Sequence, residues 1–360
     1  MSRILFAGGG TAGHIEPAIA VARQWRLSHP QDQLDFLGTA AGLESKLIPE
    51  AGFNLLLITK VRIARSLSPT LLLAPFTLVR SVLQSMSHLR GANLLVGFGG
   101  YVSAPAYLAA FLLRVPVVIH EANAKPGIAN RLGALFSKNI AVAYPVASGS
   151  FTDALIAGLP LKENIAGAYS HATADWASAR AQAKTALGFD AKKPLLFIFG
   201  GSQGSAAINA VITQARAELT AAGIQILHGA GSSHELGESD VNYQVRAYIS
   251  DMASAYLAAD LIISRSGAVT CAEVNTLGKF ALFIPLPVGN GEQKLNAAEL
   301  VDSGRAEIKD QSRFDSEWLI KNLDRLLAKS AQAPLAGSDK DMQAAAKIAS
   351  LMEFVLSGGK

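Results

Sequence analysis

The sequence predicts an α/β protein of two domains, each built on a parallel sheet covered by helices. The chain has 360 residues, and a single hydrophobic core usually divides above about 250–300 residues. An apolar strand, a glycine-rich turn and a helical pattern open each half of the chain. Between these two openings, apolar runs of strand length alternate with helical patterns, as is typical of parallel sheets.

The two openings match closely. Residues 3–7 form an apolar strand, followed by the turn Gly8-Gly-Gly-Thr-Ala-Gly13 and a helical pattern over residues 18–27. In the second half, a strand at 194–199 leads into a glycine-rich turn at 200–205 and a helix at 206–219. Further strands are predicted at residues 34–37, 94–97, 116–120, 224–228, 261–264 and 281–284.

Glycine and proline interrupt the pattern at residues 158–162, which places the domain boundary there. We therefore expect an N-terminal domain over residues 1–160 and a second domain over residues 161–338. A final helix over residues 339–356 is followed by no strand. The segment 339–360 is expected to pack back on the first domain.

Composition excludes several classes of protein. Hydrophobic residues make up 50% of the chain and charged residues 17%, which excludes a disordered chain. The most apolar stretches are interrupted by Pro75 or Arg114 and fall short of the roughly 18 residues that cross a bilayer. No secretory leader pattern precedes the first strand. We expect a cytoplasmic protein that contacts a membrane without crossing it.

Charge and cysteine content narrow the possible ligands. The net charge of +4 suits phosphates or anionic lipids, whereas no long Lys/Arg block indicates a nucleic-acid partner. Cys271 is the only cysteine, so neither an intrachain disulfide nor a thiolate metal cluster can form within one chain. A buried core thiol is the expected role of Cys271.

The first glycine-rich turn fits the dinucleotide-binding pattern G-x-G-x-x-G through Gly8, Gly10 and Gly13. An NAD-dependent enzyme would also need an acidic residue after the second strand, where the chain has Gly38 and Thr39. That reading is therefore disfavoured. His14 begins the following helix, whose dipole should lower the pKa of the imidazole. His14 is a candidate general base or substrate contact, with a capping or packing role as the alternative.

The second half offers two further anion-binding turns. Residues 200–205 can present backbone amides together with the Ser202 hydroxyl, or form only a tight structural turn. Residues 264–273 follow a strand and start a helix, on which Glu273 could bind both hydroxyls of a ribose. A solvated helix glutamate is the alternative.

Polar clusters follow two other strands, at residues 120–123 and 291–297, where amide and carboxylate groups suit sugar hydroxyls. The sequence Asp339-Lys-Asp341 has the D-x-D form of a metal motif. Because it lies far from every other feature, we interpret it as a solvated helix N-terminus. No metal site is predicted.

Taken together, six motifs closely resemble the MurG family of bacterial UDP-N-acetylglucosamine transferases. They are His14-Ile-Glu-Pro-Ala18, Gly97-Phe-Gly-Gly-Tyr-Val-Ser-Ala-Pro105, His120-Glu-Ala-Asn123, Gly200-Gly-Ser-Gln-Gly204, Arg265-Ser-Gly-Ala268 with Glu273, and Gln293 with Asn296-Ala297. The motifs occur in family order from residue 3 to about residue 300. The resemblance implies a GT-B fold, in which two Rossmann-like domains face each other across a deep cleft.

The resemblance also implies an activity, which is transfer of N-acetylglucosamine from UDP-GlcNAc to lipid I, giving lipid II for peptidoglycan synthesis. The reaction would invert the anomeric carbon and need no obligatory metal or cofactor. The expected location is the cytoplasmic face of the cell membrane, where the protein would be peripheral. The expected partners are lipid I and an anionic membrane surface, and other cell-wall synthesis or division proteins are further candidates. Two alternatives remain, a UDP-GlcNAc epimerase and a non-catalytic nucleotide-sugar sensor.

The resemblance assigns roles residue by residue. Ile249 would contact uracil, Glu273 the ribose and Gln293 the sugar. The full set of expected donor contacts is Thr11, Ala12, Gly13, Asn123, Lys162, Ser202, Ile249, Arg265, Ala268, Val269, Thr270, Cys271, Ala272, Glu273 and Gln293. Further sugar or acceptor candidates are Gly100, Tyr101, Asn130 and Asn296.

The chain departs from the family pattern at three positions: Ala12 replaces a glycine, Leu159 an asparagine and Lys162 an arginine. Lys162 keeps the charge but loses the planar fork of arginine.

The acceptor hydroxyl needs a base, and the sequence leaves His14 as first choice and Glu121 as second.

Residues 62–90 interleave apolar side chains with basic ones. Such a segment can place apolar groups at the lipid headgroup boundary while the cations attract anionic lipid. The predicted membrane patch comprises Leu72, Phe76, Val79 and Arg80. The alternative is a helix whose apolar face packs on the core.

Overall fold

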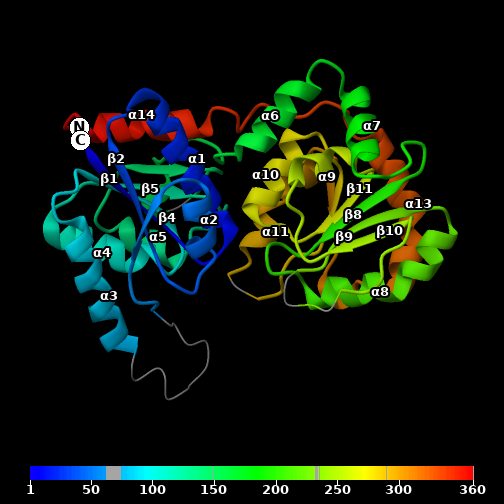
Figure 1. Cartoon of the computed structure of the whole chain (residues 1–360), viewed down its shortest axis with the longest axis horizontal. Coiled ribbons are helices and arrows are strands. Elements are labelled where there is room, and N and C mark those ends of the chain that lie inside the picture. The colour runs from blue at the N-terminus through cyan, green and yellow to red at the C-terminus, as the bar shows by residue number, and fades with distance from the viewer. Residues whose placement is uncertain (62–73, 148, 232–233, 235, 289, 360) are drawn as a thin grey trace. The chain divides into compact units, whose positions relative to one another are not determined.

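The computed structural model describes residues 1–61, 74–147, 149–231, 234, 236–288 and 290–359. The chain divides into two compact units (Figure 1). The first unit comprises Met1–Lys162 and Asp341–Lys360, and the second comprises Glu163–Lys340. Each unit is an α/β domain with its own parallel sheet.

The first unit contains a seven-stranded sheet in the order β3-β2-β1-β4-β5-β6-β7. All of its pairings are parallel. The strands are β1 (Arg3–Gly8), β2 (Gln33–Gly38), β3 (Asn54–Leu57), β4 (Leu94–Gly99), β5 (Val117–Glu121), β6 (Ile140–Val142) and β7 (Leu155–Ile156).

Helices cover both faces of this sheet. They are α1 (Ala12–Ser28), α2 (Glu44–Glu50), α3 (Ala74–Leu89), α4 (Ser103–Leu113), α5 (Ile128–Gly133) and α14 (Ala344–Leu356), with a 3₁₀ turn at Gly149–Phe151. Phe6 of β1 lies in one core cluster with Trp25 of α1 and Met352 of α14. The adjacent Leu5 lies in a second cluster with Tyr107 of α4. Successive side chains of a strand point to opposite faces, so both faces of β1 are buried.

The second unit contains a six-stranded parallel sheet in the order β10-β9-β8-β11-β12-β13. Its strands are β8 (Leu195–Phe199), β9 (Gln225–Gly229), β10 (Tyr243–Arg246), β11 (Leu261–Ser264), β12 (Ala281–Phe283) and β13 (Ala306–Ile308). Its helices are α6 (Glu163–Ala172), α7 (Trp176–Ala186), α8 (Ala206–Ala221), α9 (Met252–Ala258), α10 (Ala268–Thr276), α11 (Glu292–Asn296), α12 (Ala298–Asp302) and α13 (Ser316–Gln332), with a 3₁₀ turn at Gln311–Arg313.

The core of the second unit also lies on both sides of its sheet. Ile198 of β8 packs in one cluster with Ile212 of α8 and Leu323 of α13. On the other face, the ring of Tyr256 in α9 meets those of Phe197 and Phe199 edge-on. The alternation along β8 therefore joins α8 and α13 to one face and α9 to the other.

The final helix begins later than expected. The sequence predicted a helix from residue 339, whereas α14 starts at Ala344. The expectation that Asp339-Lys-Asp341 is solvated is wrong for Asp341, which is buried. Its Oδ1 accepts a hydrogen bond from the Leu159 amide at 2.8 Å. The carboxylate thus binds the chain next to the point where it leaves the first unit, instead of capping a helix.

Candidate acceptor and donor sites

In each sheet the strand order reverses at one central point, called the topological switch point. Ligands of open α/β sheets bind there, beyond the carboxyl ends of the strands. In the first unit this point lies between β1 and β4, and in the second between β8 and β11. The segments that follow these four strands carry His14, at the start of α1, and Tyr101, Ser202 and Arg265 in loops. Each unit therefore has its own cluster of predicted site residues.

His14 lies in the first turn of α1, half-buried beside the loop after β4. Its Nδ1 is 3.2 Å from Oγ1 of Thr11, and a side-chain carbon on Gly100 would lie 3.3 Å from the same Nδ1. Burial lowers the pKa of His14 below its ordinary value of 6.5, against opposing effects from Glu121 and the Gly9 backbone. The imidazole is therefore neutral at pH 7 and able to accept a proton.

Glu121 ends β5, and both oxygens of its buried carboxylate accept hydrogen bonds. Oε1 accepts from the amide and the side chain of Asn123 at 2.9 and 3.1 Å. Oε2 accepts from the Gly127 amide and the Asn130 side chain, both at 2.9 Å. Each oxygen of Glu121 already accepts two hydrogen bonds, so a substrate hydroxyl could reach it only by displacing one of these donors. This geometry favours His14 over Glu121 as the base.

Asn130 and His120 hold the end of β5 in place through buried hydrogen bonds. The Asn130 side chain also donates to the His120 carbonyl at 3.0 Å and accepts from the Tyr107 hydroxyl at 2.7 Å. The His120 ring is buried, with Nε2 3.0 Å from the Gly158 carbonyl oxygen, and burial lowers its pKa to about 4. Asn130 thus positions Glu121, and His120 links β5 to the chain before the unit boundary.

Lys162 forms an ion pair within the first unit. Its Nζ lies 3.0 Å from Oε1 of Glu16, in the first half of α1. Ala12 and Gly13 begin the same helix, and the side chain of its N-cap residue Thr11 does not cap the backbone amides. The amides at that end are thus oriented to meet an acceptor or donor oxygen.

The sequence did not identify Glu44 as a site residue. Its carboxylate is buried at the start of α2 and contacts Gly10, Thr39 and Tyr101. Because acidic residues are common in exposed first turns of helices, the sequence pattern carries no signal for this role. The Gly10 amide, which faces a phosphate in dinucleotide-binding loops, here meets a carboxylate.

The glycine-rich loop of the second unit forms a tight turn between β8 and α8. Gly201 and Gly204 have positive φ angles of 93° and 78°. A side-chain carbon on Gly204 would lie 2.1 Å from the Ala230 carbonyl oxygen, so no other residue fits. Ser205 caps α8 through the Ile208 amide at 3.4 Å. Ser202 lies half-buried within this loop.

Arg265 ties this loop to the next strand. Its guanidinium donates to Oγ of Ser205 at 2.8 Å, to Oε1 of Gln311 at 2.6 Å and to the Ile284 carbonyl at 2.8 Å. These bonds place a cation directly beside the loop, where it can also stabilise an anion. Burial lowers the pKa of Arg265.

Helix α10 presents the predicted donor segment. Its N-cap residue is Gly267, which has no side chain to cap the helix, and the amides of the first turn, Ala268 to Thr270, have no intrahelical partners. Ala272 and Cys271 are buried, and burial raises the pKa of the Cys271 thiol, which confirms its expected core position. Val269 is half-buried in the same turn.

Glu273 is buried on α10, which excludes the alternative of a solvated helix glutamate. Its Oε2 accepts a hydrogen bond from Tyr256 at 2.8 Å. Ile249 is buried before α9, and Asn296 is buried with its amide 3.4 Å from the Ser266 carbonyl. Gln293 accepts from the Leu286 amide at 2.9 Å.

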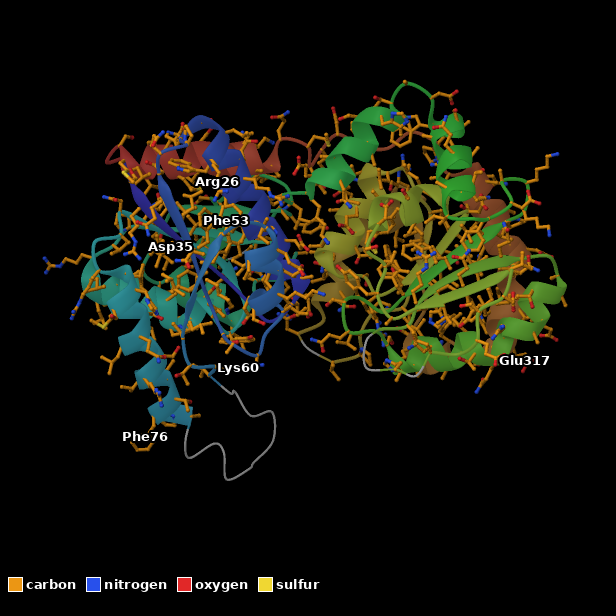
Figure 2. The ribbon with its side chains drawn as sticks, in the orientation of Figure 1. Arg26, Asp35, Phe53, Lys60, Phe76 and Glu317 are labelled. Atoms are coloured by element: carbon orange, nitrogen blue, oxygen red, sulfur yellow. The ribbon has the colours of Figure 1, made fainter. Side chains whose placement is uncertain are left out.

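Helix α3 packs Val82, Met86 and Leu89 on the core and leaves a second group of apolar side chains exposed. Phe76, Val79 and Leu83 are 75%, 58% and 60% exposed, whereas Ser81 and Ser85 are fully buried. Phe76 projects from the beginning of the helix (Figure 2). The core-facing alternative is therefore wrong for these side chains. Arg80, also predicted for the patch, is exposed. Leu72, the remaining predicted member, lies outside the described residues.

Family profiles match both halves of the chain. The profile described as "Glycosyltransferase family 28 N-terminal domain" matches residues 4–142. The profile described as "Glycosyltransferase family 28 C-terminal domain" matches residues 195–353.

Curated relatives extend the match over nearly the whole chain. A protein of Frankia casuarinae is 40% identical over 97% of this chain and 95% of its own length. One of Corynebacterium glutamicum is 42% identical over 94% and 93%, respectively. Both are named UDP-N-acetylglucosamine--N-acetylmuramyl-(pentapeptide) pyrophosphoryl-undecaprenol N-acetylglucosamine transferase. The chain belongs to the MurG family.

Solved structures agree with this membership. The crystal structure of Acinetobacter baumannii MurG has a TM-score of 0.68 at 28% identity and covers 98% of this chain and 99% of its own. A UDP-GlcNAc 2-epimerase of Neisseria meningitidis has a TM-score of 0.60 at only 14% identity, over 98% of this chain and 100% of its own. That likeness shows the shared GT-B fold alone. Membership in the MurG family therefore rests on sequence, and the fold is common to several activities.

Proposed function

We propose that this chain transfers N-acetylglucosamine from UDP-GlcNAc to the C4 hydroxyl of the N-acetylmuramic acid in lipid I, giving lipid II for peptidoglycan synthesis. The observation that carries this proposal is the 40% identity over 97% of the chain to a transferase of that name. The epimerase alternative has support only from a fold shared at 14% identity. The sensor alternative has no specific support.

In the proposed step, the acceptor oxygen attacks the anomeric carbon of the donor sugar from the side opposite UDP. The bond between that carbon and the β-phosphate oxygen breaks, and its electron pair leaves with UDP. The hydroxyl proton passes to the neutral imidazole of His14, and the nearby carboxylate of Glu121, held by four donors, favours the imidazolium that forms. Attack from the opposite side inverts the configuration at the anomeric carbon.

We propose that the second unit binds the UDP part of the donor. The loop before α8 and the first turn of α10 supply backbone amides for the diphosphate, with Ser202 and Arg265 beside them. Amides at helix N-termini stabilise phosphate oxygens through hydrogen bonds and the helix dipole. Glu273 would accept from the ribose, Ile249 would meet uracil and Gln293 the sugar. This set supplies charge stabilisation for departing UDP, so we propose that turnover needs no metal.

We further propose that the outward face of α3 docks on an anionic membrane at the cytoplasmic side. Phe76, Val79 and Leu83 lie on one helix face, because residues three, four and seven apart share a face. The exposed Arg80 adds a cation, and each cation near an anionic surface contributes about 1 kcal/mol. No helix in the described part of the chain is long and apolar enough to cross a bilayer.

Labelled UDP-GlcNAc, incubated with the purified chain in the presence and absence of lipid I, tests the proposed reaction. Lipid-I-dependent release of UDP supports transfer. Conversion of the sugar without lipid I would indicate an epimerase, and binding of UDP-GlcNAc with neither reaction would indicate a sensor. A parallel reaction with excess chelator tests the metal proposal, because a metal-dependent enzyme would lose its turnover.

A further inference from the structure

The carboxylate of Glu44 joins three loops of the first unit. Oε1 accepts from the Thr39 amide at 3.2 Å, the Thr39 hydroxyl at 2.8 Å and the Tyr101 hydroxyl at 2.6 Å. Oε2 accepts from the Gly10 amide at 3.3 Å. Gly10, Thr39 and Tyr101 follow β1, β2 and β4, which are neighbours in the sheet. One side chain therefore fixes the loops at the carboxyl ends of three adjacent strands.

The surrounding backbone is shaped to hold this carboxylate. A side-chain carbon on Gly42 would lie 2.1 Å from Oε2 of Glu44, and one on Gly38 would lie 2.7 Å from its Cγ. Burial alone would raise the pKa of Glu44, but the bonds from Tyr101, Thr39 and Gly10 outweigh it and keep the pKa below its usual value. The group is thus a buried anion whose charge is met by hydrogen bonds.

Two of the three loops, those after β1 and β4, lie beside the imidazole of His14. A side-chain carbon on Gly99 would lie 3.4 Å from Cδ2 of the ring, and one on Gly100 would lie 3.3 Å from Nδ1. The Gly9 backbone also hydrogen-bonds to the imidazole, and its carbonyl oxygen lies close to Gly100. Gly9 and Gly100 both lie beside the imidazole, and Glu44 binds the next residue along the chain from each, Gly10 and Tyr101.

Within the transferase function proposed above, we propose that Glu44 is a positioning residue that fixes the direction of the His14 imidazole through Gly10 and Tyr101. Its carboxylate does not need to touch either substrate. Glycine-rich backbone has little stiffness of its own, so the direction of the ring depends on what anchors the loops. Small displacements of a base lower turnover strongly, because proton transfer needs hydrogen-bond geometry.

Glu44→Gln tests this assignment with almost no change of shape. An amide offers one acceptor oxygen and an NH₂ donor, whereas both oxygens of Glu44 accept from donors. The NH₂ group must therefore face a donor, and one loop loses its anchor. We expect kcat to fall by about 10- to 100-fold while the KM for UDP-GlcNAc stays within about twofold.

Asp35→Asn is the matched control. Asp35 is also a buried carboxylate of the first unit, bound by Arg3, Gln33 and Asn54, and it lies on β2 itself (Figure 2). Its loss should cost stability without moving His14, so kcat per folded molecule should stay near the wild-type value. If Glu44→Gln also keeps its kcat, or loses activity only in proportion to the unfolded fraction, the assignment is wrong.

A double-mutant cycle with Tyr101→Phe measures whether the effects of the two substitutions on kcat are coupled. A merely structural role of Glu44 would not produce such coupling in kcat. Tyr101→Phe removes one bond to Glu44 and keeps the ring, over which Lys60 lies 4.9 Å from the centroid. If both residues act on one element, Tyr101→Phe should lower kcat in the wild type but much less in Glu44→Gln. Independent, additive losses in the two backgrounds would contradict the assignment.

Should Glu44→Gln not fold, Tyr101→Phe and Thr39→Val each remove one donor and leave the carboxylate in place. Each is expected to lower kcat several-fold, and unchanged kcat in both would overturn the assignment. An absence of lipid-I-dependent transfer by the wild-type chain would instead overturn the proposed function, so the two failures are distinguishable.

Discussion

The hydroxyl of Tyr256 donates a 2.8 Å hydrogen bond to Oε2 of Glu273, and both side chains are buried in the second unit. The bond joins α9 to α10 and fixes the carboxylate just after the first turn of α10. A phenol this buried requires its partner, and burial raises the pKa of Tyr256 well above its ordinary value. The geometry thus gives Glu273 one fixed direction, as a specific ribose contact requires.

We predict that Glu273→Ala raises the Kd for UDP by about 10- to 100-fold, because a buried charged hydrogen bond contributes about 1.5–3 kcal/mol. Isothermal titration calorimetry measures this directly. Tyr256→Phe removes the same internal bond but keeps the carboxylate, so its Kd should change much less. Glu218→Ala, an exposed substitution on α8, should not change it. Unchanged affinity in Glu273→Ala would remove Glu273 from the donor site.

His14→Ala should lower kcat by about 10²- to 10⁴-fold, the usual effect of losing a general base. The affinity for UDP should change little, because most proposed contacts to UDP lie in the second unit. Steady-state kinetics with lipid I and calorimetry with UDP separate the two effects. Near-normal turnover would assign the base to Glu121 or to solvent.

The pH dependence follows from the direction of the His14 pKa. Burial lowers this pKa below 6.5, so the imidazole is mostly neutral at pH 7 and protonates as the pH falls. We predict that kcat/KM is constant through neutral pH and falls on the acid side, with an apparent pKa below 6.5. The acid limb should disappear in the residual activity of His14→Ala. A limb centred above pH 7 would contradict the assignment.

Replacing Phe76 and Val79 with serine and Arg80 with glutamate should reduce binding to vesicles rich in anionic phospholipid. These side chains are exposed, so folding and UDP affinity should persist. Leu27→Ser is the matched control, since Leu27 is 79% exposed on α1 of the same unit. Vesicle sedimentation measures the loss. Equal binding by the triple variant and the control would place the docking surface elsewhere.

Asp341→Ala should lower the free energy of unfolding by about 1–3 kcal/mol, because the Leu159 amide loses a buried acceptor. Asp339→Ala, an exposed neighbour, should lower it by less than about 0.5 kcal/mol. Denaturant unfolding of both variants gives the difference. Equal stability would show that the bond contributes nothing to folding.

The fold was largely predictable because its central strands are buried on both faces. Runs such as residues 261–263 are uniformly apolar, and the structure has β11 at Leu261–Ser264. No comparable signal marks β7, which has only two residues, Leu155 and Ile156, both exposed. Short edge strands depend on pairing with a neighbour, and two residues are too few to show an apolar run or an alternation.

The site was predictable where glycine patterns mark it and not where tertiary contacts create it. Gly201 and Gly204 have positive φ angles, so their spacing predicted the turn before α8. Asp341 and Glu44 gave no local signal, because each is buried by residues distant in sequence. Acidic residues near helix N-termini are usually solvated, and only the fold reveals these exceptions.

Analysis of the product formed from lipid I tests the central claim most directly. The account predicts that the wild-type chain adds a single N-acetylhexosamine to lipid I, seen by mass spectrometry. Nuclear magnetic resonance should then show a β linkage to the C4 oxygen of N-acetylmuramic acid, inverted from the α-linked donor. An α linkage, attachment to another oxygen, or an epimerised free sugar with unmodified lipid I would contradict it.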